Sequence, residues 1–519
     1  TRNITIDLGV RYEFTSLPYG EKQQSVNNLA SVPGLISFGE PKPQRTNWAP
    51  RVGVAWSPDS NTSVRAGFGM AYDVLYDNLG ILSSPPQFSQ TVDLTCAASN
   101  PWQCGPGFLA GGGIKPSASA GTLSAADARA GTSAYVPDQV LPYSINWNLS
   151  VQRSFAKDYT LSVSYVGTRG VHLPTQVRLD QEAIVQPGHS LPTYLSNPGQ
   201  AALDALPLTL ETLQAQFKAT KTPNASGGIP LSYYNAGFQS QITAFMPWSN
   251  SHYNGLSAQL DRRFAAGLTF RAAYTWSHNI DDATATAFTT VFSPRRPEDF
   301  GNLSLDRANS ILDHRQRFTI ATYYDLPLFA HSQNYLLKNV VGNWVAAPVY
   351  TYQTPEFYVV QSNVDSNLNG DTASDRTVYN PNGVTGTSSL VKPLYNSAGA
   401  TVAYIANNAN AQYIQAGAGV LPNVGRNTLA GRPTNDLDLT LAKRISFGER
   451  LKFEFQAQFL NSLNHPQYLP GSINDVQLGT YTSSAVRNML ITGQKNFNRP
   501  DQVLSSNPRT IQLTAKFRF

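Results

Sequence analysis

Charged residues are scarce in this sequence. Asp, Glu, Lys and Arg make up 14% of its 519 residues, whereas a soluble globular protein carries about 25%. The sequence also lacks any stretch approaching about 18 consecutive apolar residues, which excludes a bundle of transmembrane helices. Its mean hydropathy of −0.27 agrees with that exclusion. Aromatic residues, in contrast, reach 11%. We therefore expect a β-rich protein with a surface that does not face water alone.

Cysteine and clustered basic charge are also nearly absent. Lys and Arg total 38 against 33 for Asp and Glu, a formal net charge of +5 with no basic block. Nucleic acid is therefore not an expected partner. The two cysteines, Cys96 and Cys104, lie in a Gly/Ser/Pro-rich stretch. Their spacing fits a small loop disulfide in an oxidising compartment, and a pair of unrelated free thiols is the alternative.

The common catalytic and metal-binding signatures are missing as well. There is no HExxH motif, CxxC pair, GxSxG elbow or GxxxxGK[ST] loop, and the seven histidines show no metal-ligand spacing. Asp281 and Asp282 follow His278 closely, but a solvated loop entrance is the favoured interpretation of this group. We predict that the chain is not an enzyme and that it holds no zinc.

Twelve segments of the sequence alternate apolar and polar residues. Each covers about 10 positions, the length that a tilted strand needs to cross a bilayer. In residues 451–459, Leu451, Phe453 and Phe455 point to one side while Lys452 and Glu454 point to the other, because successive strand side chains face opposite sides. A single strand of this kind also fits a soluble β-sandwich, but twelve in succession favour a membrane barrel. The predicted strands are residues 4–14, 51–57, 64–73, 145–155, 159–167, 256–264, 268–277, 318–326, 344–353, 437–447, 451–459 and 511–519.

The connections between these strands alternate between short and long. Short ones cover residues 58–61, 156–158, 265–267 and 448–449, with a medium one at 327–342. Long ones cover residues 15–50, 74–141, 169–253, 278–317, 354–436 and 462–509. Long structureless loops are uncommon in compact soluble domains, whereas tight periplasmic turns and large extracellular loops are typical of outer-membrane barrels. The predicted fold is all-β: a transmembrane antiparallel β-barrel with long extracellular loops, located in the bacterial outer membrane and surrounded by its lipid.

This topology assigns roles to several side chains. Both ends of the chain are expected at the periplasmic rim, because the predicted strand number is even. Rings such as Trp56, Trp147 and Trp344 are expected at the lipid headgroup level. Charged residues on the polar side of the strands would line a lumen that is wet or filled by a plug. These lumen-facing candidates are Asp7, Arg11, Arg65, Asp261, Arg263 and Arg271.

One long connection carries a candidate calcium site. Calcium prefers several oxygen ligands, and alternating Asp and Asn side chains converge near a turn-forming glycine, here Gly370. The match is partial, because Arg376 stands where an EF-hand loop has Glu. An Asx/Gly-rich loop that only turns the chain is the alternative. The candidate ligands are Asp365, Asn367, Asn369, Asp371 and Asp375.

Another connection contains a helical pattern. Between residues 198 and 221, an apolar residue recurs near a helical spacing at Leu203, Leu206, Leu210, Leu213 and Phe217. This predicts a short amphipathic helix packed on the loops, with a partner-binding helix as the alternative.

Several strings resemble Oar-like TonB-dependent outer-membrane proteins. They are PYSINWNLSVQR at residues 142–153, YTWSH at 274–278, DHRQRF at 313–318, GRNT at 425–428, NDLDLTL at 435–441 and FQAQFLNSLNHP at 455–466. The final residues, Lys516, Phe517, Arg518 and Phe519, resemble the C-terminal signal that the barrel assembly machinery recognises. An ordinary edge strand is the alternative interpretation of that last segment.

The resemblance implies a 22-stranded barrel with an internal plug, preceded by a carboxypeptidase-regulatory-like β-sandwich. Residues 1–519 are then expected to be the C-terminal part of the barrel, with the plug and the sandwich outside this sequence. The family implies that an extracellular ligand binds the loops and plug and that TonB, acting through those missing parts, drives transport. The alternatives are a non-energised surface protein whose loops serve adhesion, and a soluble β-protein with carbohydrate-binding loops.

Overall fold

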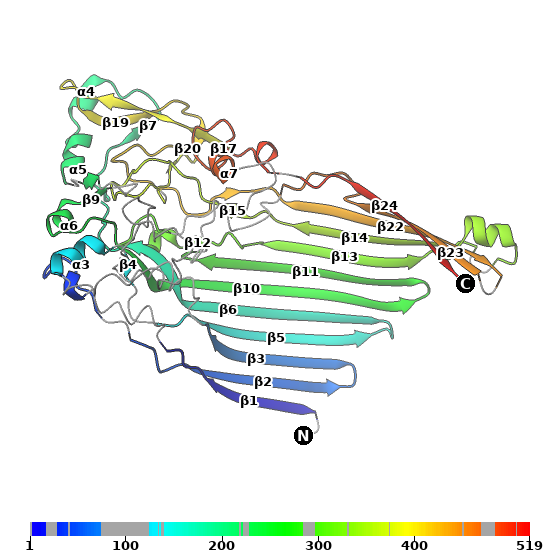
Figure 1. Cartoon of the computed structure of the whole chain (residues 1–519). Helices are drawn as coiled ribbons and strands as arrows, with labels where there is room; N and C mark the ends of the chain where they lie inside the picture. Colours follow the sequence, from blue (N-terminus) through cyan, green and yellow to red (C-terminus); the bar gives the residue numbers. More distant parts are fainter. Residues whose placement is uncertain are drawn as a thin grey trace, which may run out of the picture.

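A single antiparallel sheet dominates the structure (Figure 1). The computed structural model describes residues 3–16, 28–39, 42–73, 124–132, 134–135, 140–216, 219–221, 228–283, 296–329, 332–372, 374–448, 451–468, 483–504 and 506–519. Twelve long strands, which we call the wall, pair with one another in sequence order. They are β1 (Ile4–Tyr12), β2 (Trp48–Asp59), β3 (Thr62–Tyr72), β5 (Tyr143–Phe155), β6 (Tyr159–Arg178), β10 (Thr243–Ala265), β11 (Leu268–Asp281), β13 (Gln316–Asp325), β14 (Trp344–Gln353), β22 (Thr434–Phe447), β23 (Leu451–Leu460) and β24 (Thr510–Arg518). Each predicted strand is confirmed by one of them.

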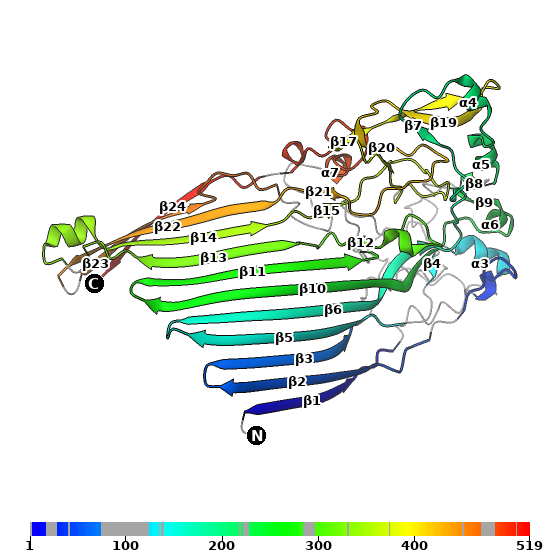
Figure 2. The same cartoon turned by 180° about the vertical axis from the view of Figure 1, so that it is seen from behind.

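The wall is an open, twisted sheet. Among the described residues, β1 and β24 form its two edges and pair with no further strand (Figure 2). The short connections lie together at one end of the wall, where Figure 1 also marks both chain ends. At this end the β10–β11 turn places both Ala266 (φ 49°) and Gly267 (φ 80°) in the left-handed region, which suits a tight two-residue turn that follows the twist of the strands.

The two faces of the wall differ in chemistry. Direct cross-strand pairing joins one apolar row over seven strands: Ile6, Val54, Ala66, Leu149, Tyr165, Leu256 and Trp276. The next row on the opposite face contains Asp7, Gly53, Gly67 and Asn148. Ile6 is 63% exposed and Leu513 of β24 is 62% exposed. Apolar side chains are thus displayed on the surface of the wall, the reverse of a soluble sandwich.

A tryptophan covers a glycine on the apolar face. Trp147 of β5 lies opposite Gly167 of β6, and a Cβ added to Gly167 would overlap the ring of Trp147. We expect Gly167→Ala to displace the ring and to lower the free energy of unfolding by about 1–3 kcal/mol, as overpacking does. Urea unfolding of the protein folded into lipid vesicles measures this. Gly9→Ala is the matched control, since its Cβ would meet nothing within 4 Å; equal effects of the two variants would contradict the packing described here.

Two wall strands extend further than the sequence predicted. β6 continues from Gly167 to Arg178, and β10 begins at Thr243, so the predicted ends at residues 167 and 256 were wrong. Pro174 and Pro247 indicated loops in these two segments, because proline has no N–H group to donate to a neighbouring strand. The register of the β6–β10 pair shifts between Met246 and Ser249, so both prolines lie at an irregularity, where a missing N–H donor is tolerated.

The long connections fold together into one packed cap, which we call the crown. It comprises the described residues of segments 13–47, 73–142, 179–242, 282–315, 354–433 and 461–509. Its helices are α3 (Ala125–Gly131), α4 (Gln200–Asp204), α5 (Leu210–Gln216), α6 (Leu231–Asn235), η3 (Leu303–Asp306), α7 (Ser483–Asn488) and η5 (Pro500–Gln502). Its short strands are β4 (Ala134–Tyr135), β7 (Thr193–Tyr194), β8 (Ala219–Lys221), β9 (Gly228–Pro230), β12 (Ala308–Asn309), β15 (Phe357–Tyr358), β16 (Val378–Tyr379), β17 (Val384–Ser389), β18 (Val391–Tyr395), β19 (Thr401–Ala406), β20 (Ala411–Ile414) and β21 (Leu429–Ala430). At the opposite end, η4 (Leu337–Val341) lies in the medium turn.

The predicted helix in residues 198–221 is corrected to two short helices. α4 and α5 are separated at residues 205–209, and Pro207 within this gap cannot continue a helix. Leu203 and Leu213 are buried as an amphipathic pattern requires, but in different clusters. Phe217 of the predicted pattern lies outside the described residues.

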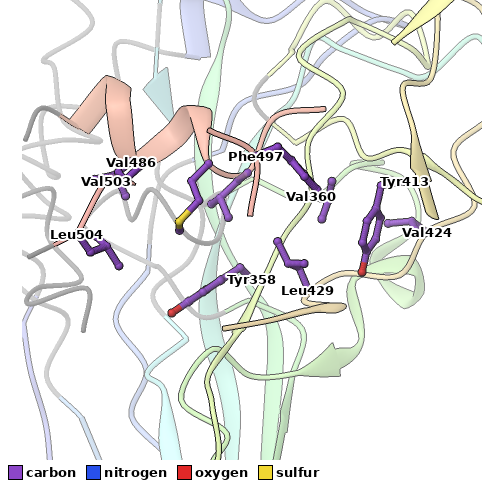
Figure 3. Packing of buried hydrophobic residues seen from close by; sticks show 11 residues of the cluster. Tyr358, Val360, Tyr413, Val424, Leu429, Val486, Phe497, Val503 and Leu504 are labelled. Carbon is purple, nitrogen blue, oxygen red and sulfur yellow. The ribbon is translucent and has the colours of Figure 1, made fainter. Parts of the chain in front are cut away.

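Much of the buried apolar core lies in the crown. Tyr358, Val360, Tyr413, Val424 and Leu429 from one connection pack against Val486, Met489, Leu490, Phe497, Val503 and Leu504 from another (Figure 3). A second cluster joins Leu191 and Leu213 to Tyr404 and Val420. The sequence predicted these segments only as long connections and gave no sign of a shared core. Their apolar residues are too widely spaced along the chain to form a core locally and become buried only when the connections meet.

Candidate functional site

The polar face of the wall carries most of the predicted lumen-facing residues; Arg263 lies within the register shift between Arg262 and Ala265. The cross-strand register places Asp7, Arg65, Asp261 and Arg271 on the face opposite the apolar rows. Asp261 and Arg271 form an ion pair with a 2.6 Å Nε–Oδ1 distance. Arg11 pairs with Glu13 at 2.7 Å near the crown end, and the backbone N–H of Arg263 donates to Asp158 O near the short-turn end.

A second group of charges on this face was not predicted. Arg444 of β22 contacts Glu454 at 3.0 Å and Asp325 at 3.2 Å, and it donates a hydrogen bond to the Tyr323 hydroxyl. Lys516, a residue of the predicted assembly signal, lies 3.6 Å from Glu454. Phe517 and Phe519 of that signal are exposed on the apolar side. The sequence did carry a signal for this group, because all of these charges occupy polar positions in strands that alternate apolar and polar residues.

Buried ion pairs hold the crown together. Arg376 is ion-paired with Glu298, donates to Leu305 O at 3.0 Å and lies 3.7 Å from Asp306. All three charged side chains are buried. Glu298 and Asp306 belong to the connection after β11, whereas Arg376 belongs to the connection after β14. The contact therefore joins two segments that are distant in the sequence.

Two further arginines extend this network. Arg296 pairs with Asp371, and Arg426 pairs with Asp281 and donates to Asp306 O at 2.6 Å. The interpretation of Asp281 as part of a solvated loop entrance was wrong, because this residue is 5% exposed and bound to Arg426. Its neighbour His278 contacts Arg315 and Asn309 instead.

The predicted calcium ligands lie together but bind mainly to the chain itself. Both carboxylate oxygens of Asp365 accept backbone N–H groups, from Asn369 and Gly370, at 2.9 Å. The side-chain oxygens of Asn367 and Asn369 accept the N–H groups two residues on, which is the Asx-turn geometry of the alternative interpretation. Asp371 pairs with Arg296, and Ser366 Oγ donates to Asp375. Within the described part of the chain, no group of three or more His, Cys, Asp or Glu side chains is placed to hold a metal ion. The calcium site stays a prediction.

The crown also contains a cavity that the sequence did not reveal. It has a volume of about 580 Å³ and is lined from several connections, by Leu35, by residues 177–182 and Ile184, by Gln216, by the α6 region and by Phe300 and Gly301. Trp248 of β10 and Tyr233 of α6 contribute rings, while Arg178, Asp180 and Glu182 contribute charge. The only sequence signal was a charged run from Arg178 to Glu182 in a chain otherwise poor in charge.

Asp180 is the buried carboxyl group of this cavity. Its Oδ1 accepts the Ile242 N–H at 2.9 Å, while its Oδ2 has no hydrogen-bond partner within the described residues. Burial raises the pKa of Asp180 from 3.8 to about 6, against the backbone N–H groups and Arg178 that favour the charged form. The group is therefore close to titration under physiological conditions.

This shift predicts a pH-dependent crown. A carboxyl whose pKa is higher in the folded state binds a proton on folding, so its favourable contribution is complete below about pH 4 and is lost as pH rises through about 6. Hydrogen exchange of the Ile242 amide, corrected for the intrinsic rate, should show protection falling between pH 4 and pH 7. Asp180→Asn should flatten this dependence, because the amide stays neutral while still accepting the Ile242 N–H. An unchanged pH profile in Asp180→Asn would disprove the role given to Asp180.

The predicted disulfide, Cys96 and Cys104, lies outside the described residues. In the described part of the chain, no helix is both long and apolar enough to traverse a membrane.

An antiparallel wall with one apolar and one polar face, capped at a single end, defines the class of outer-membrane barrel proteins. The family of outer membrane β-barrel domains matches residues 1–499, and the chain belongs to this family. Its location is therefore the outer membrane, its apolar rows face lipid, and the soluble alternative is wrong. The short turns then face the periplasm and the crown faces the outside.

Solved structures with a similar fold include three outer-membrane proteins. The outer membrane transporter YddB from Escherichia coli has 9% identity and a TM-score of 0.40, with 100% of this chain and 43% of that chain covered. The pyoverdine outer membrane receptor FpvA from Pseudomonas aeruginosa PAO1 has 9% identity and a TM-score of 0.40, with 100% and 40% covered. The ferric enterobactin receptor PfeA from Pseudomonas aeruginosa has 10% identity and a TM-score of 0.36, with 91% and 40% covered. The chain spans less than half the length of these proteins. No curated protein matches the sequence significantly.

Proposed function

We propose that the chain forms part of a TonB-dependent outer-membrane transporter or receptor of the Oar-like type, in which the crown captures an extracellular ligand. The observation that carries this proposal is the folded crown. Six connections converge on one end of the wall, and three of them line a cavity together with the ends of β6 and β10, an arrangement suited to recognition outside the cell.

The two unpaired edges support a larger barrel. Strands at an open edge leave N–H and C=O groups without partners, and each such group costs several kcal/mol in hydrocarbon. Within the described residues, β1 and β24 are such edges. We propose that further strands complete the barrel, 22 in total, and that a plug and a carboxypeptidase-regulatory-like domain belong to the same protein. Assembly by the barrel machinery through Lys516, Phe517, Arg518 and Phe519 is part of this proposal.

TonB binding is the property that separates transport from the alternative. The full-length protein, extracted with detergent from outer membranes, would be passed over the immobilised C-terminal domain of TonB. Specific retention, with a general porin from the same extract as the unretained control, is the expected result. If the folded protein passes through as the porin does, the alternative of a non-energised adhesion protein replaces our proposal.

A further inference from the structure

The crown cavity is an open pocket with the size of a small-molecule site. Its volume of about 580 Å³ lies within the range of about 300–1,000 Å³ that is typical of ligand pockets. The apolar part of the cavity lining comes from Leu35, Val177, Leu179, Ile184 and Pro230. Phe300 and Ile242 anchor the surrounding segments in buried clusters, so the cavity is built on packed structure rather than on isolated loops.

The cavity carries charges of both signs, so a ligand with a single charge meets at least one repelling group whichever its sign. Arg178 repels a cation, while Asp180 and Glu182 repel an anion. The remaining polar side chains, Gln181, Gln216 and Ser232, can each both donate and accept hydrogen bonds. These polar side chains can be satisfied by an uncharged ligand that offers many hydrogen-bond donors and acceptors.

Two buried polar atoms also call for a ligand with hydrogen-bonding groups. Asp180 Oδ2 and Arg178 Nε have no hydrogen-bond partner within the described residues, and both residues line the cavity. A buried polar atom without a partner is unfavourable, because it has given up its hydrogen bonds to water. Hydroxyl groups can accept from the guanidinium and donate to the carboxylate at the same time, so a ligand rich in hydroxyls would recover this cost after a small side-chain rotation.

The rings of the cavity complete the match. Trp248, Tyr233 and Phe300 line it together, and Trp248 is 41% exposed. Large exposed rings bind flat apolar surfaces at low entropic cost, while Trp and Tyr keep a polar group for hydrogen bonding. Sugar rings present hydroxyls around their edge and C–H groups on their faces. We propose that the crown cavity binds a neutral saccharide, an inference that rests on the proposed role of the crown in ligand capture.

The test is saccharide binding to the full-length protein. It would be purified in a detergent without a sugar headgroup, such as lauryldimethylamine oxide, and titrated calorimetrically with cellobiose, maltose and lactose. Glucosamine, glucuronic acid and trialanine serve as cationic, anionic and peptide comparators. We expect saturable binding of at least one neutral disaccharide, at least tenfold tighter than that of any comparator.

Two cavity variants and two matched controls locate the site. Trp248→Ala and Glu182→Gln remove a ring and a charge from the lining and should weaken binding at least tenfold and severalfold, respectively. Tyr234→Ala and Glu211→Gln change exposed residues outside the lining and should leave the affinity within twofold. Trp248 and Glu182 are both exposed, so neither variant is expected to unfold the crown.

Three results would overturn the inference. They are the absence of saturable binding by all three disaccharides, tighter binding of a charged or peptide comparator, and equal effects of the cavity and control variants. Retention on TonB does not depend on this cavity. Saccharide binding without TonB retention would therefore contradict the proposed transport and support the saccharide site. TonB retention without saccharide binding would contradict only the saccharide site.

Discussion

Arg376→Met is expected to unfold the crown locally while leaving the wall intact. The variant removes the cation that faces Glu298 and Asp306. Removing one partner of a buried ion pair costs about 3–5 kcal/mol, because the remaining charge is left without compensation. Hydrogen exchange followed by mass spectrometry should show faster exchange in residues 296–313 and 360–377, with β-strand protection in the wall unchanged.

The pH dependence of this effect has a definite sign. Burial raises the pKa of Glu298 to about 7 and also raises that of Asp306, despite the attraction of Arg376. Without Arg376 both carboxyl groups take up protons more readily. The destabilisation caused by Arg376→Met should therefore be smaller at pH 5, where Glu298 is neutral, than at pH 8. At pH 8, Glu298 is either buried as an uncompensated carboxylate or protonated at a free-energy cost.

Arg307→Met is the matched control for Arg376→Met. Arg307 pairs with Asp282 at 3.3 Å, but its side chain is 46% exposed, and an exposed pair contributes only about 0–1 kcal/mol. If both variants exchange at the same rate, the buried network does not hold the crown together.

An arginine on the apolar face of the wall is expected to be the most damaging strand substitution. Leu441 lies in the middle of β22, between Ala346 and Ala457 on the lipid-facing side. Leu441→Arg should lower the free energy of unfolding from lipid vesicles by about 2–4 kcal/mol, the cost of arginine near the bilayer midplane.

Thr440→Arg supplies the control at almost the same depth. Thr440 pairs with Ala347 and Gln458 on the polar face, where an arginine stays out of the hydrocarbon. Its effect should be under about 1 kcal/mol, as for ordinary substitutions on polar surface. Urea titrations of both variants in the same vesicles decide the point, and a larger loss for Thr440→Arg would reverse the assignment of the two faces.

The wall could be predicted because its strands and turns are determined by residues that are close together in the sequence. A period of two residues in segments such as 451–459 fixes both the strand and the side that each residue faces. Short turns such as the one at Gly267 determine which strands are neighbours. The extension of β6 and β10 was missed because Pro174 and Pro247 contradict a strand locally, and only the register shift in their pairing accommodates them.

The crown could not be predicted because its contacts are not local. The parallel pairing of β7 with β19 joins Thr193 to Tyr404, and the Arg376–Glu298 pair spans two connections. No sequence period marks such contacts. Tyr233 and Trp248 meet Asp180 in one cavity through the same kind of long-range packing. The predicted calcium group illustrates the difficulty, since its Asp and Asn residues are mainly engaged by nearby backbone N–H groups and by Arg296.

The orientation of the wall in lipid is tested most directly by spin-label accessibility along β22. Nitroxides would be placed singly at positions 436 to 441 in the Cys96→Ser/Cys104→Ser background, in the protein inserted in outer-membrane lipid. Dissolved oxygen, which concentrates in hydrocarbon, should relax the labels at 437, 439 and 441 strongly, whereas a water-soluble nickel chelate should relax those at 436, 438 and 440 wherever water reaches the polar face. Accessibility to oxygen without a two-residue period, or with its maxima at the even positions, would contradict the account.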